Sequence, residues 1–346
     1  ALLLAACLAP RAAEAQWKGY PTAYGIELGD SSGISVQHWL TPKHAIAASV
    51  GWQVNLDAGV LSLYEGPTAA LDYRETAPAA ATRDMFLDAS GQLTDKSVVG
   101  HLAAGVPGAV MGLWEAHQRF GTMQWGDLVQ PAIDLAEGFE VVERQARSFR
   151  WGAESFTLFA PTAEAFLPGG EPAAEGETFS QPDLAATLTR IRNLGPAGFY
   201  EGVTADLIVA EMVRGDGIMT HQDLASYRAA WREPIVFDYR DYTLISMPPS
   251  SSGGATMAEM ANILEAFDLA SLGWNTPETI HLVAEAWRRA YADRNHYMAD
   301  TDFVEVPIEE LISDEYAARR RETISMDAAT PSLEVGPGLE PVDRGS

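Results

Sequence analysis

The chain has 346 residues and a formal net charge of −25, from 23 lysines and arginines against 48 aspartates and glutamates. A surface this acidic repels phosphate backbones and anionic lipids, which argues against nucleic-acid and peripheral-membrane roles. Hydrophobic residues make up 47% of the chain, enough for one large domain or two ordinary domains with a substantial core.

The first fifteen residues are typical of an export signal. Residues 1–10 read ALLLAACLAP, which is too short to span a bilayer, and residues 13–15 (AEA) have the form of a signal-peptidase site. We therefore expect a truncated export signal at 1–15 and a periplasmic or secreted protein. The single cysteine, Cys7, could instead carry a lipid anchor; being alone, it excludes an intramolecular disulfide and thiolate-clustered metal sites.

Residues 16–59 form a strand-rich segment. Apolar and polar side chains alternate there, and turn-forming pairs at 29–30 and 41–42 interrupt the alternation. The predicted strands are 24–28, 34–40 and 45–52, followed by a hairpin of 61–64 and 69–73.

Helical periodicity dominates from residue 107 onward. Proline is favoured in the first turn of a helix and glycine just past its end, so these residues mark the expected boundaries. The stretch 160–178, rich in Gly, Pro, Ala and Glu, is predicted to be an exposed loop. The expected helices begin at Pro107, Pro131 and Pro182 and end at Gly121, Gly138 and Gly195, and a fourth runs through Ile208 and Met212 to Gly215.

A second hairpin is predicted at 235–246, because apolar residues alternate on both sides of a possible turn. The sequence PPSSSGG at 248–254 then passes from stiff prolines to permissive glycines immediately before another helix. Strands flanked by amphipathic helices indicate an α/β or α+β layered domain.

The longest helix is expected to start at Thr276, as its cap, and Pro277. Periodicity fades after about Arg321, so 326–346 is predicted to be a mobile tail. The apolar stripe predicted along the longest helix consists of Ile280, Val283, Ala284, Trp287 and Tyr291.

Local signatures of several enzyme classes are absent. The sequence has no G-x-S-x-G, H-E-x-x-H, Walker A or G-x-G-x-x-G motif. His281 and Glu285 could share a metal from one helix face, but a pair at the solvent edge is favoured because no third ligand is near in sequence. Asp300, Asp302 and Glu305 resemble a calcium loop only loosely. We expect neither a metal site nor a cofactor.

The most informative cluster is residues 71–78, LDYRETAP. Arg74 stands where a strand ends and a proline stops the pattern, so its planar guanidinium could point into a cleft and bind a carboxylate through two hydrogen bonds. The alternative is a structural Arg74 paired with Asp72, Glu75 or Asp84, the commoner role for a charged residue.

Several further segments stand in order along the chain at consistent spacing. With the first, they are LDYRETAPAAATRDMFLD (71–88), GVPGAVMGLWEAHQRFGTMQW (105–125), PAIDLAEGFEV (131–141), GPAGFYEG (195–202), IMT (218–220), DLASY (223–227), REPI (232–235), SMPPSSSGG (246–254), EAWRRAYADR (285–294) and DTDFVEVP (300–307). One such segment alone could be coincidence, but together they cover about 60–325 and resemble the γ-glutamyltranspeptidase family.

The resemblance implies an αββα four-layer N-terminal-nucleophile hydrolase sandwich, of which this chain would be the large-subunit part. Members of the family cut themselves into a large and a small subunit, and the new N-terminal threonine of the small subunit is the nucleophile. It takes the γ-glutamyl group of glutathione or another γ-glutamyl compound and passes it to water or to an amino-acid or peptide acceptor. Arg74 matches the family arginine that holds the substrate's α-carboxylate.

The sequence departs from the family pattern at both ends. No Thr-Thr-His start of a small subunit is present, and Ser346 falls about where cleavage would occur. We therefore expect no catalytic residue in this chain, which would be inactive without a small subunit. The family's G-G-N-A-V-D-A-A and Ser-Gly-Ile-Gly-Gly-Gly runs are also missing, so 16–59 is an atypical segment that does not match the family pattern, and the sequence does not decide whether it is native to the domain.

These observations divide the chain into an export signal (1–15), an atypical strand-rich segment (16–59), a large-subunit domain (60–325) and a tail before the expected processing site (326–346). The leading hypothesis is the large subunit of an exported γ-glutamyltransferase or glutathione hydrolase. The alternatives are a non-catalytic truncated or fused fragment and a relative of the cephalosporin (glutaryl) acylases.

Overall fold

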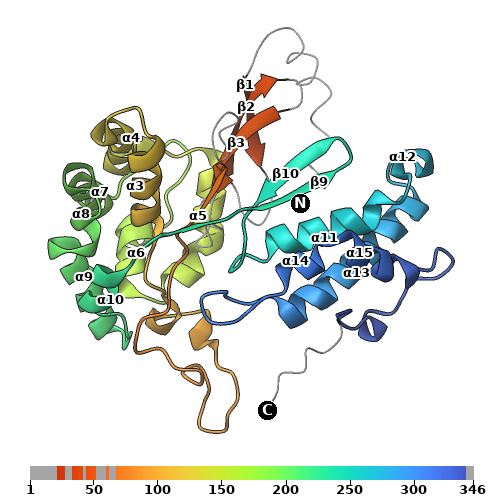
Figure 1. Cartoon of the computed structure of the whole chain (residues 1–346). Helices are drawn as coiled ribbons and strands as arrows, with labels where there is room; N and C mark the ends of the chain where they lie inside the picture. Colours follow the sequence, from red (N-terminus) through yellow and green to blue (C-terminus); the bar gives the residue numbers. More distant parts are fainter. Residues whose placement is uncertain (1–21, 28–32, 42–43, 52–59, 62–67, 340–346) are drawn as a thin grey trace. The chain divides into compact units, whose positions relative to one another are not determined.

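The computed structural model describes residues 22–27, 33–41, 44–51, 60–61 and 68–339 (Figure 1). The chain divides into two compact units: unit 1 contains Ala1–Asp72 and Ala230–Ser346, and unit 2 is Tyr73–Ala229. The fold is mostly helical with small sheets, while the four-layer arrangement stays a prediction. The expected export signal with Cys7, and residues 340–346 of the expected tail, lie outside the described residues.

Unit 2 is a group of helices with one short two-stranded ribbon. Its main core joins Val106, Tyr200, Leu224 and Tyr227, which are almost completely buried. Its elements are α3 (Ala109–Phe120), α4 (Trp125–Glu137), α5 (Glu143–Phe156), α6 (Ala160–Phe166), α7 (Pro182–Leu194), α8 (Ala197–Tyr200), α9 (Gly202–Arg214) and α10 (His221–Ser226), three 3₁₀ turns at Asp95–Ser97, His101–Ala103 and Pro168–Gly170, and the antiparallel pair β6 (Phe139–Glu140) and β7 (Thr178–Phe179).

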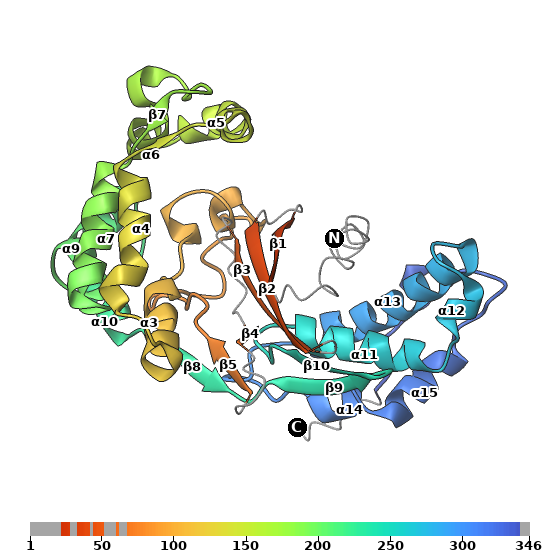
Figure 2. The same ribbon diagram turned by 90° about the horizontal axis from the view of Figure 1, so that it is seen from above.

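Helix α7 begins and ends at the residues that the sequence predicts, with Pro182 in its first turn and Gly195 as its C-cap. Helix α4, by contrast, begins at Trp125, so that Pro131 lies inside it rather than at its start. Packing explains the difference, because α4 and α7 lie side by side (Figure 2) and bury a shared cluster around Ile133 and Ala185. This burial offsets the hydrogen bond that an interior proline removes.

The predicted loop 160–178 is partly helical, which corrects the sequence-based expectation. It contains α6 and a 3₁₀ turn at Pro168–Gly170. Phe166 packs against Phe179, which together with Val141 belongs to a second buried cluster of unit 2. The apolar residues that stand between the glycines and prolines of this stretch are therefore partly buried, and this burial stabilises its helical part.

Within its described residues, unit 1 contains three antiparallel sheets. The hairpin predicted at 235–246 is confirmed, and Figure 1 shows its two strands near the helix that follows. Its buried residues Ile235 and Phe237 pack on Ala255 and Ala258 of that helix. The strands are β1 (Thr22–Glu27), β2 (Gly33–Thr41) and β3 (His44–Gly51), paired in the order β1-β2-β3; β4 (Val60–Leu61), β5 (Ala69–Asp72) and β8 (Ala230–Arg232), in the order β4-β5-β8; and β9 (Ile235–Tyr239) with β10 (Tyr242–Ser246).

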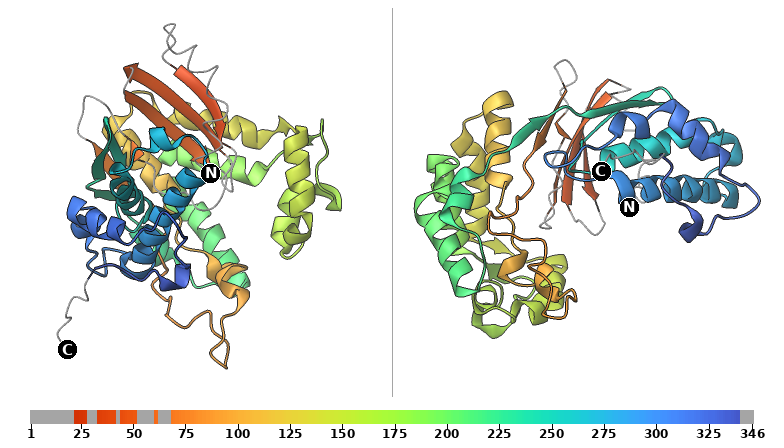
Figure 3. Two further views of the ribbon diagram at one scale, coloured as in Figure 1. Left: turned by 90° about the vertical axis from the view of Figure 1, so that its right-hand side faces the viewer. Right: turned by 60° about the horizontal axis from the view of Figure 1, so that its bottom comes forward.

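In unit 1, helix α11 packs against α13, the longest helix, and against α15; these helices are among the cyan and blue ribbons of Figure 3. The cap predicted for α13 is confirmed, since Thr276 Oγ1 accepts from the main-chain nitrogen of Thr279 at 3.3 Å. No helix among the described residues is both long and apolar enough to cross a bilayer. The elements are α11 (Gly253–Glu265), α12 (Leu269–Leu272), α13 (Pro277–Tyr297), α14 (Ile308–Leu311), α15 (Asp314–Glu322) and a 3₁₀ turn at Ser332–Glu334.

The buried face of α13 is not the apolar stripe that the sequence predicts. Ile280, Trp287 and Tyr291 remain 53%, 45% and 42% exposed. The buried face instead carries three charged side chains among small and aliphatic ones, because each charge meets an opposite charge or a hydrogen-bonding group there. Its residues are Leu282, Glu285, Ala286, Arg289, Ala290 and Asp293.

The described part of the predicted mobile tail is packed against α13 and α15. Leu339 is buried beside Leu311 and Tyr316, and its carbonyl accepts a hydrogen bond from the Tyr297 hydroxyl at 3.0 Å. The sequence has no periodicity here because the segment is held by side chains of other elements rather than by its own helix or strand pairing.

Candidate functional site

Arg74 lies two residues beyond the end of β5 and is half-buried. The chain on its far side is fixed by a backbone bridge, in which Val106 donates to the Thr76 carbonyl at 2.8 Å and Thr76 donates in return at 3.3 Å. The structure thus places Arg74 at a strand end, as the sequence predicts, in a short connection held on both sides.

The carbonyl of Arg74 accepts a hydrogen bond from the hydroxyl of Tyr227 at 2.7 Å. The Tyr227 ring is stacked on that of Tyr200, with centroids 5.8 Å apart and planes inclined by 2°. The Tyr200 hydroxyl in turn donates to the Pro107 carbonyl at 2.7 Å and accepts from the Met111 nitrogen at 3.3 Å. Burial is the main reason that the pKa of Tyr200 rises to about 12, so this hydroxyl stays protonated at neutral pH.

Two glycines let residues 73–79, here called the Arg74 segment, approach the start of α3 closely. A Cβ on Gly108 would stand 2.0 Å from both the Tyr227 hydroxyl oxygen and the Tyr73 carbonyl oxygen, and a Cβ on Gly112 would stand 2.1 Å from the Tyr73 ring. Any side chain at these positions would displace the segment, which gives a physical reason for glycine at both.

Asp223 fixes the chain beyond Arg74. One carboxylate oxygen accepts from the Ala79 nitrogen at 2.7 Å, and the other accepts from the Thr220 nitrogen at 2.8 Å, closing the capping box of α10. Burial alone would raise the pKa of Asp223, but these hydrogen bonds outweigh it and lower the pKa. Asp223 is therefore charged at neutral pH, which strengthens its hold on Ala79.

Asp72, one of the candidate partners of Arg74, forms a salt bridge with Arg232 at 2.8 Å. The Arg232 guanidinium also reaches both carboxylate oxygens of Asp302, at 2.8 and 2.9 Å. The hydrogen bond to Asp302, followed by that to Asp72, raises the pKa of Arg232 although burial opposes it. This network lies in unit 1, where it joins β5, β8 and the loop after α13. Asp302, which resembled a calcium ligand, thus serves an ion pair.

His281 and Glu285 do not act as a pair. The His281 ring donates to the Ser325 carbonyl at 2.7 Å, whereas the Glu285 carboxylate is fully buried and binds Arg289 at 2.6 Å and the Thr330 hydroxyl at 2.7 Å. The solvent-edge position expected for Glu285 is therefore wrong, because its charge is compensated inside the protein. Within the part of the chain that the structure describes, no group of three or more His, Cys, Asp or Glu could hold a metal ion.

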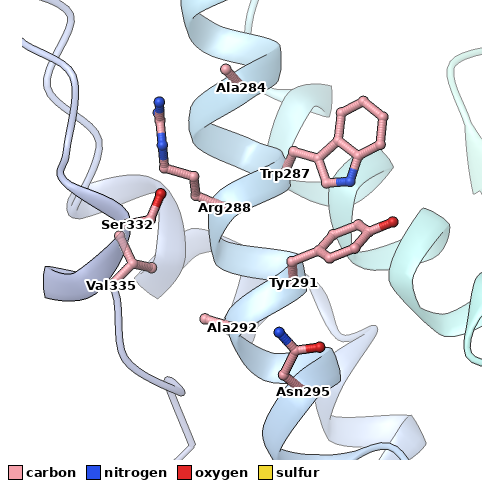
Figure 4. A pocket seen from close by; sticks show the side chains of 8 residues that line it. All are labelled: Ala284, Trp287, Arg288, Tyr291, Ala292, Asn295, Ser332 and Val335. Atoms are coloured by element: carbon pink, nitrogen blue, oxygen red, sulfur yellow. The ribbon is translucent and has the colours of Figure 1, made fainter. Parts of the chain in front are cut away.

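A shallow cavity of about 500 Å³ lies along α13 in unit 1. Figure 4 shows Trp287 and Tyr291 projecting from one side of the helix, and Arg288 on the side where Ser332 and Val335 lie. None of the eight lining residues belongs to the Arg74 segment.

Of the residues proposed from sequence, Arg74 alone was assigned to the substrate, and nothing in the structure tests that role. Sequence reasoning did not find Tyr227 and Asp223, which hold its segment. No local signal could have revealed them, since Tyr227 is 153 residues away from Arg74 along the chain. Their inclusion in the DLASY segment was the one hint.

Comparison with known proteins identifies the family. The gamma-glutamyltranspeptidase profile matches residues 59–342. The glutathione hydrolase proenzyme of Pseudomonas aeruginosa is 44% identical over 288 residues, which cover 82% of this chain and 51% of that protein. The chain spans about half the length of the curated relatives it matches.

Comparison with solved structures points to the same family. The crystal structure of Helicobacter pylori gamma-glutamyltranspeptidase superposes with a TM-score of 0.81 and 43% identity, covering 84% of each chain. A cephalosporin acylase from Bacillus halodurans superposes with a TM-score of 0.68 and 29% identity, over 76% of this chain and 50% of that one. The profile match, together with the identity to these relatives, shows that this chain belongs to the gamma-glutamyltranspeptidase family.

Proposed function

We propose that this chain is the large subunit of an exported γ-glutamyl hydrolase or transferase, and that Arg74 binds the α-carboxylate of its substrate. The observation that carries the proposal is the placement of Arg74 at the end of β5, in a connection whose backbone is fixed by Thr76 and Tyr227. A guanidinium held in this way can meet a carboxylate with two parallel hydrogen bonds.

The length relationships support a two-chain enzyme. This chain corresponds to about half of each proenzyme but to 84% of the Helicobacter pylori chain in its crystal structure. A second chain would complete the four-layer αββα sandwich and supply an N-terminal threonine. The domain boundaries at 60 and 325, and export to the periplasm or medium, belong to the same proposal.

The chemistry would be acyl transfer. The threonine hydroxyl of the small subunit attacks the γ-carbonyl, its own α-amine accepts the proton, and an ester forms as the amide bond breaks and the amine leaves protonated. Water or an acceptor amine then cleaves the ester and regenerates the threonine. Arg74 contributes orientation only, because it contacts the far end of the glutamyl group.

The test is an assay of the chain assembled with a small subunit of the family. We expect release of aniline from a γ-glutamyl anilide, and we expect Arg74→Lys to raise KM about 10- to 100-fold, since an ammonium keeps the charge but loses the forked geometry. An unchanged KM would show that Arg74 is a structural cation instead. An assembled heterodimer without activity would favour the non-catalytic fragment.

A parallel assay with a glutaryl amide separates the acylase alternative. A glutaryl group lacks the α-amino group of glutamate but keeps a carboxylate at the same end. Faster turnover of the glutaryl compound than of the γ-glutamyl compound would assign the chain to the acylase branch of its structural relatives.

A further inference from the structure

The short helix α10 touches the Arg74 segment at two points. The Tyr227 hydroxyl, at the C-cap of the helix, donates to the Arg74 carbonyl at 2.7 Å, and Asp223 accepts from the Ala79 nitrogen at 2.7 Å. We propose that Tyr227 is a positioning residue for Arg74: it fixes the main chain from which the guanidinium is aimed at the substrate carboxylate. This inference rests on the proposed function.

Tyr227 is itself rigid enough for this role. It is 4% exposed, and its ring lies parallel to that of Tyr200, whose hydroxyl is fixed at the start of α3. A buried aromatic ring with one hydrogen-bonding end has little rotational freedom, so the Tyr227 oxygen has a defined position. The hydrogen bond therefore fixes the Arg74 carbonyl relative to the buried core of unit 2, to which Tyr227 belongs.

Gly108 shows how tightly this arrangement is built. A Cβ on Gly108 would lie 2.0 Å from both the Tyr227 oxygen and the Tyr73 carbonyl oxygen. The start of α3 is therefore in close contact with both residues. The Arg74 main chain is thus held by Tyr227, by its neighbour Tyr73 against α3, and by the bridge at Thr76.

Loss of one of these attachments has a specific kinetic signature. Bidentate recognition of a carboxylate tolerates little displacement, so a looser Arg74 main chain weakens substrate binding. The α-carboxylate does not change during the reaction, and Arg74 should hold it equally in the ground and transition states. Such uniform binding affects KM and leaves kcat almost unchanged.

The experiment compares Tyr227→Phe with wild type in the assembled two-subunit enzyme. Phenylalanine keeps the ring stack with Tyr200 and removes one hydrogen bond, so we expect KM for a γ-glutamyl anilide to rise about 3- to 10-fold with kcat within about 2-fold. The same anilide with its α-carboxylate converted to an amide should show no such change. In an Arg74→Lys background, Tyr227→Phe should add little further effect.

Tyr297→Phe is the matched control, because its hydroxyl also donates to a main-chain carbonyl, that of Leu339 at 3.0 Å, in unit 1. It should leave KM unchanged. If Tyr227→Phe does not fold, Asp223→Ala releases the other attachment of the same segment and should give the same rise in KM.

An unchanged KM in an active, folded Tyr227→Phe or Asp223→Ala enzyme overturns the inference. Equal increases for the carboxylate and amide substrates also overturn it, because they show general loosening of the fold. A wild-type assembly without any turnover of the γ-glutamyl anilide removes the proposed function, and this inference falls with it.

Discussion

Asp293, on α13, accepts a hydrogen bond from the main-chain nitrogen of Gly338, 45 residues further along the chain, at 2.7 Å. Its other oxygen accepts from the Tyr316 hydroxyl at 2.6 Å and lies 3.0 Å from Arg320. Asp293 is completely buried, yet both of its carboxylate oxygens accept hydrogen bonds and one of them also pairs with a guanidinium. The described part of the tail is therefore attached to α13 through this buried carboxylate, to which Gly338 adds one hydrogen bond beside the hydrogen bond from Tyr316 and the ion pair with Arg320.

Replacement of Gly338 should loosen this attachment. A Cβ there would stand 2.5 Å from the Tyr316 hydroxyl oxygen and 2.7 Å from an Arg320 nitrogen, so Gly338→Ala forces these groups apart. We expect a loss of about 1–3 kcal/mol in the free energy of unfolding and faster amide hydrogen exchange over 328–339. Gly336→Ala, which meets no atom within 4 Å, should change neither. Equal behaviour of the two variants would contradict the docked tail.

Stability should fall as the pH rises toward 9. Burial first, and then the hydrogen bond and charge of Asp293, raise the pKa of Glu259 from 4.5 to about 9, while Arg320 opposes the shift. Between these values the folded state holds a proton that the unfolded state has released, so the free energy of unfolding decreases with pH.

Urea unfolding from pH 5 to 9 measures this slope. Glu259→Gln, which mimics the protonated form, should flatten it, whereas Glu322→Gln, at an exposed position on α15, should leave it intact. A slope that persists in Glu259→Gln would assign the titration to another group.

Glu285→Gln should be one of the most damaging single substitutions. It leaves Arg289, which is 1% exposed, without its compensating charge, and we expect a cost of about 3–5 kcal/mol in urea unfolding. Glu143→Gln breaks an ion pair with Arg150 in which both side chains are more than half exposed, so it should cost less than about 1 kcal/mol. Similar costs would indicate that water reaches Glu285.

Acid titration gives an independent check on Glu285. Burial would raise its pKa, but hydrogen bonds from Thr330 and Arg289 outweigh burial and lower the pKa to about 2. Stability contributed by this carboxylate should therefore be present above pH 4.5 and be lost as the pH falls toward 2. The Gln variant should lack this loss.

Two aliphatic residues on α13 test which of its faces is buried. Leu282 is fully buried and Ile280 is 53% exposed. Leu282→Ala should lower the free energy of unfolding by about 2–5 kcal/mol, measured by urea unfolding, and Ile280→Ala by less than about 1 kcal/mol. The reverse order of costs would indicate that the buried face of α13 is the apolar stripe that the sequence predicts.

The sequence predicts local structure well where proline, glycine and capping residues act on their immediate neighbours. Helix α7 runs between Pro182 and Gly195, α13 starts after Thr276, and the hairpin at 235–246 forms as expected. Arg74 likewise follows the strand end that the sequence predicts, while its role in substrate binding stays a prediction. These features depend on residues only a few positions apart, so a linear pattern contains them.

What the sequence determined by itself is therefore the family, the principal elements and one candidate binding residue. The tertiary structure decided which face of α13 is buried, that the tail docks through Asp293, and that Tyr227 holds the Arg74 main chain. Charged residues usually mark a solvent-facing side, and that rule fails where ion pairs and hydrogen bonds compensate burial. Those partners come from distant parts of the chain, and only folding brings them together.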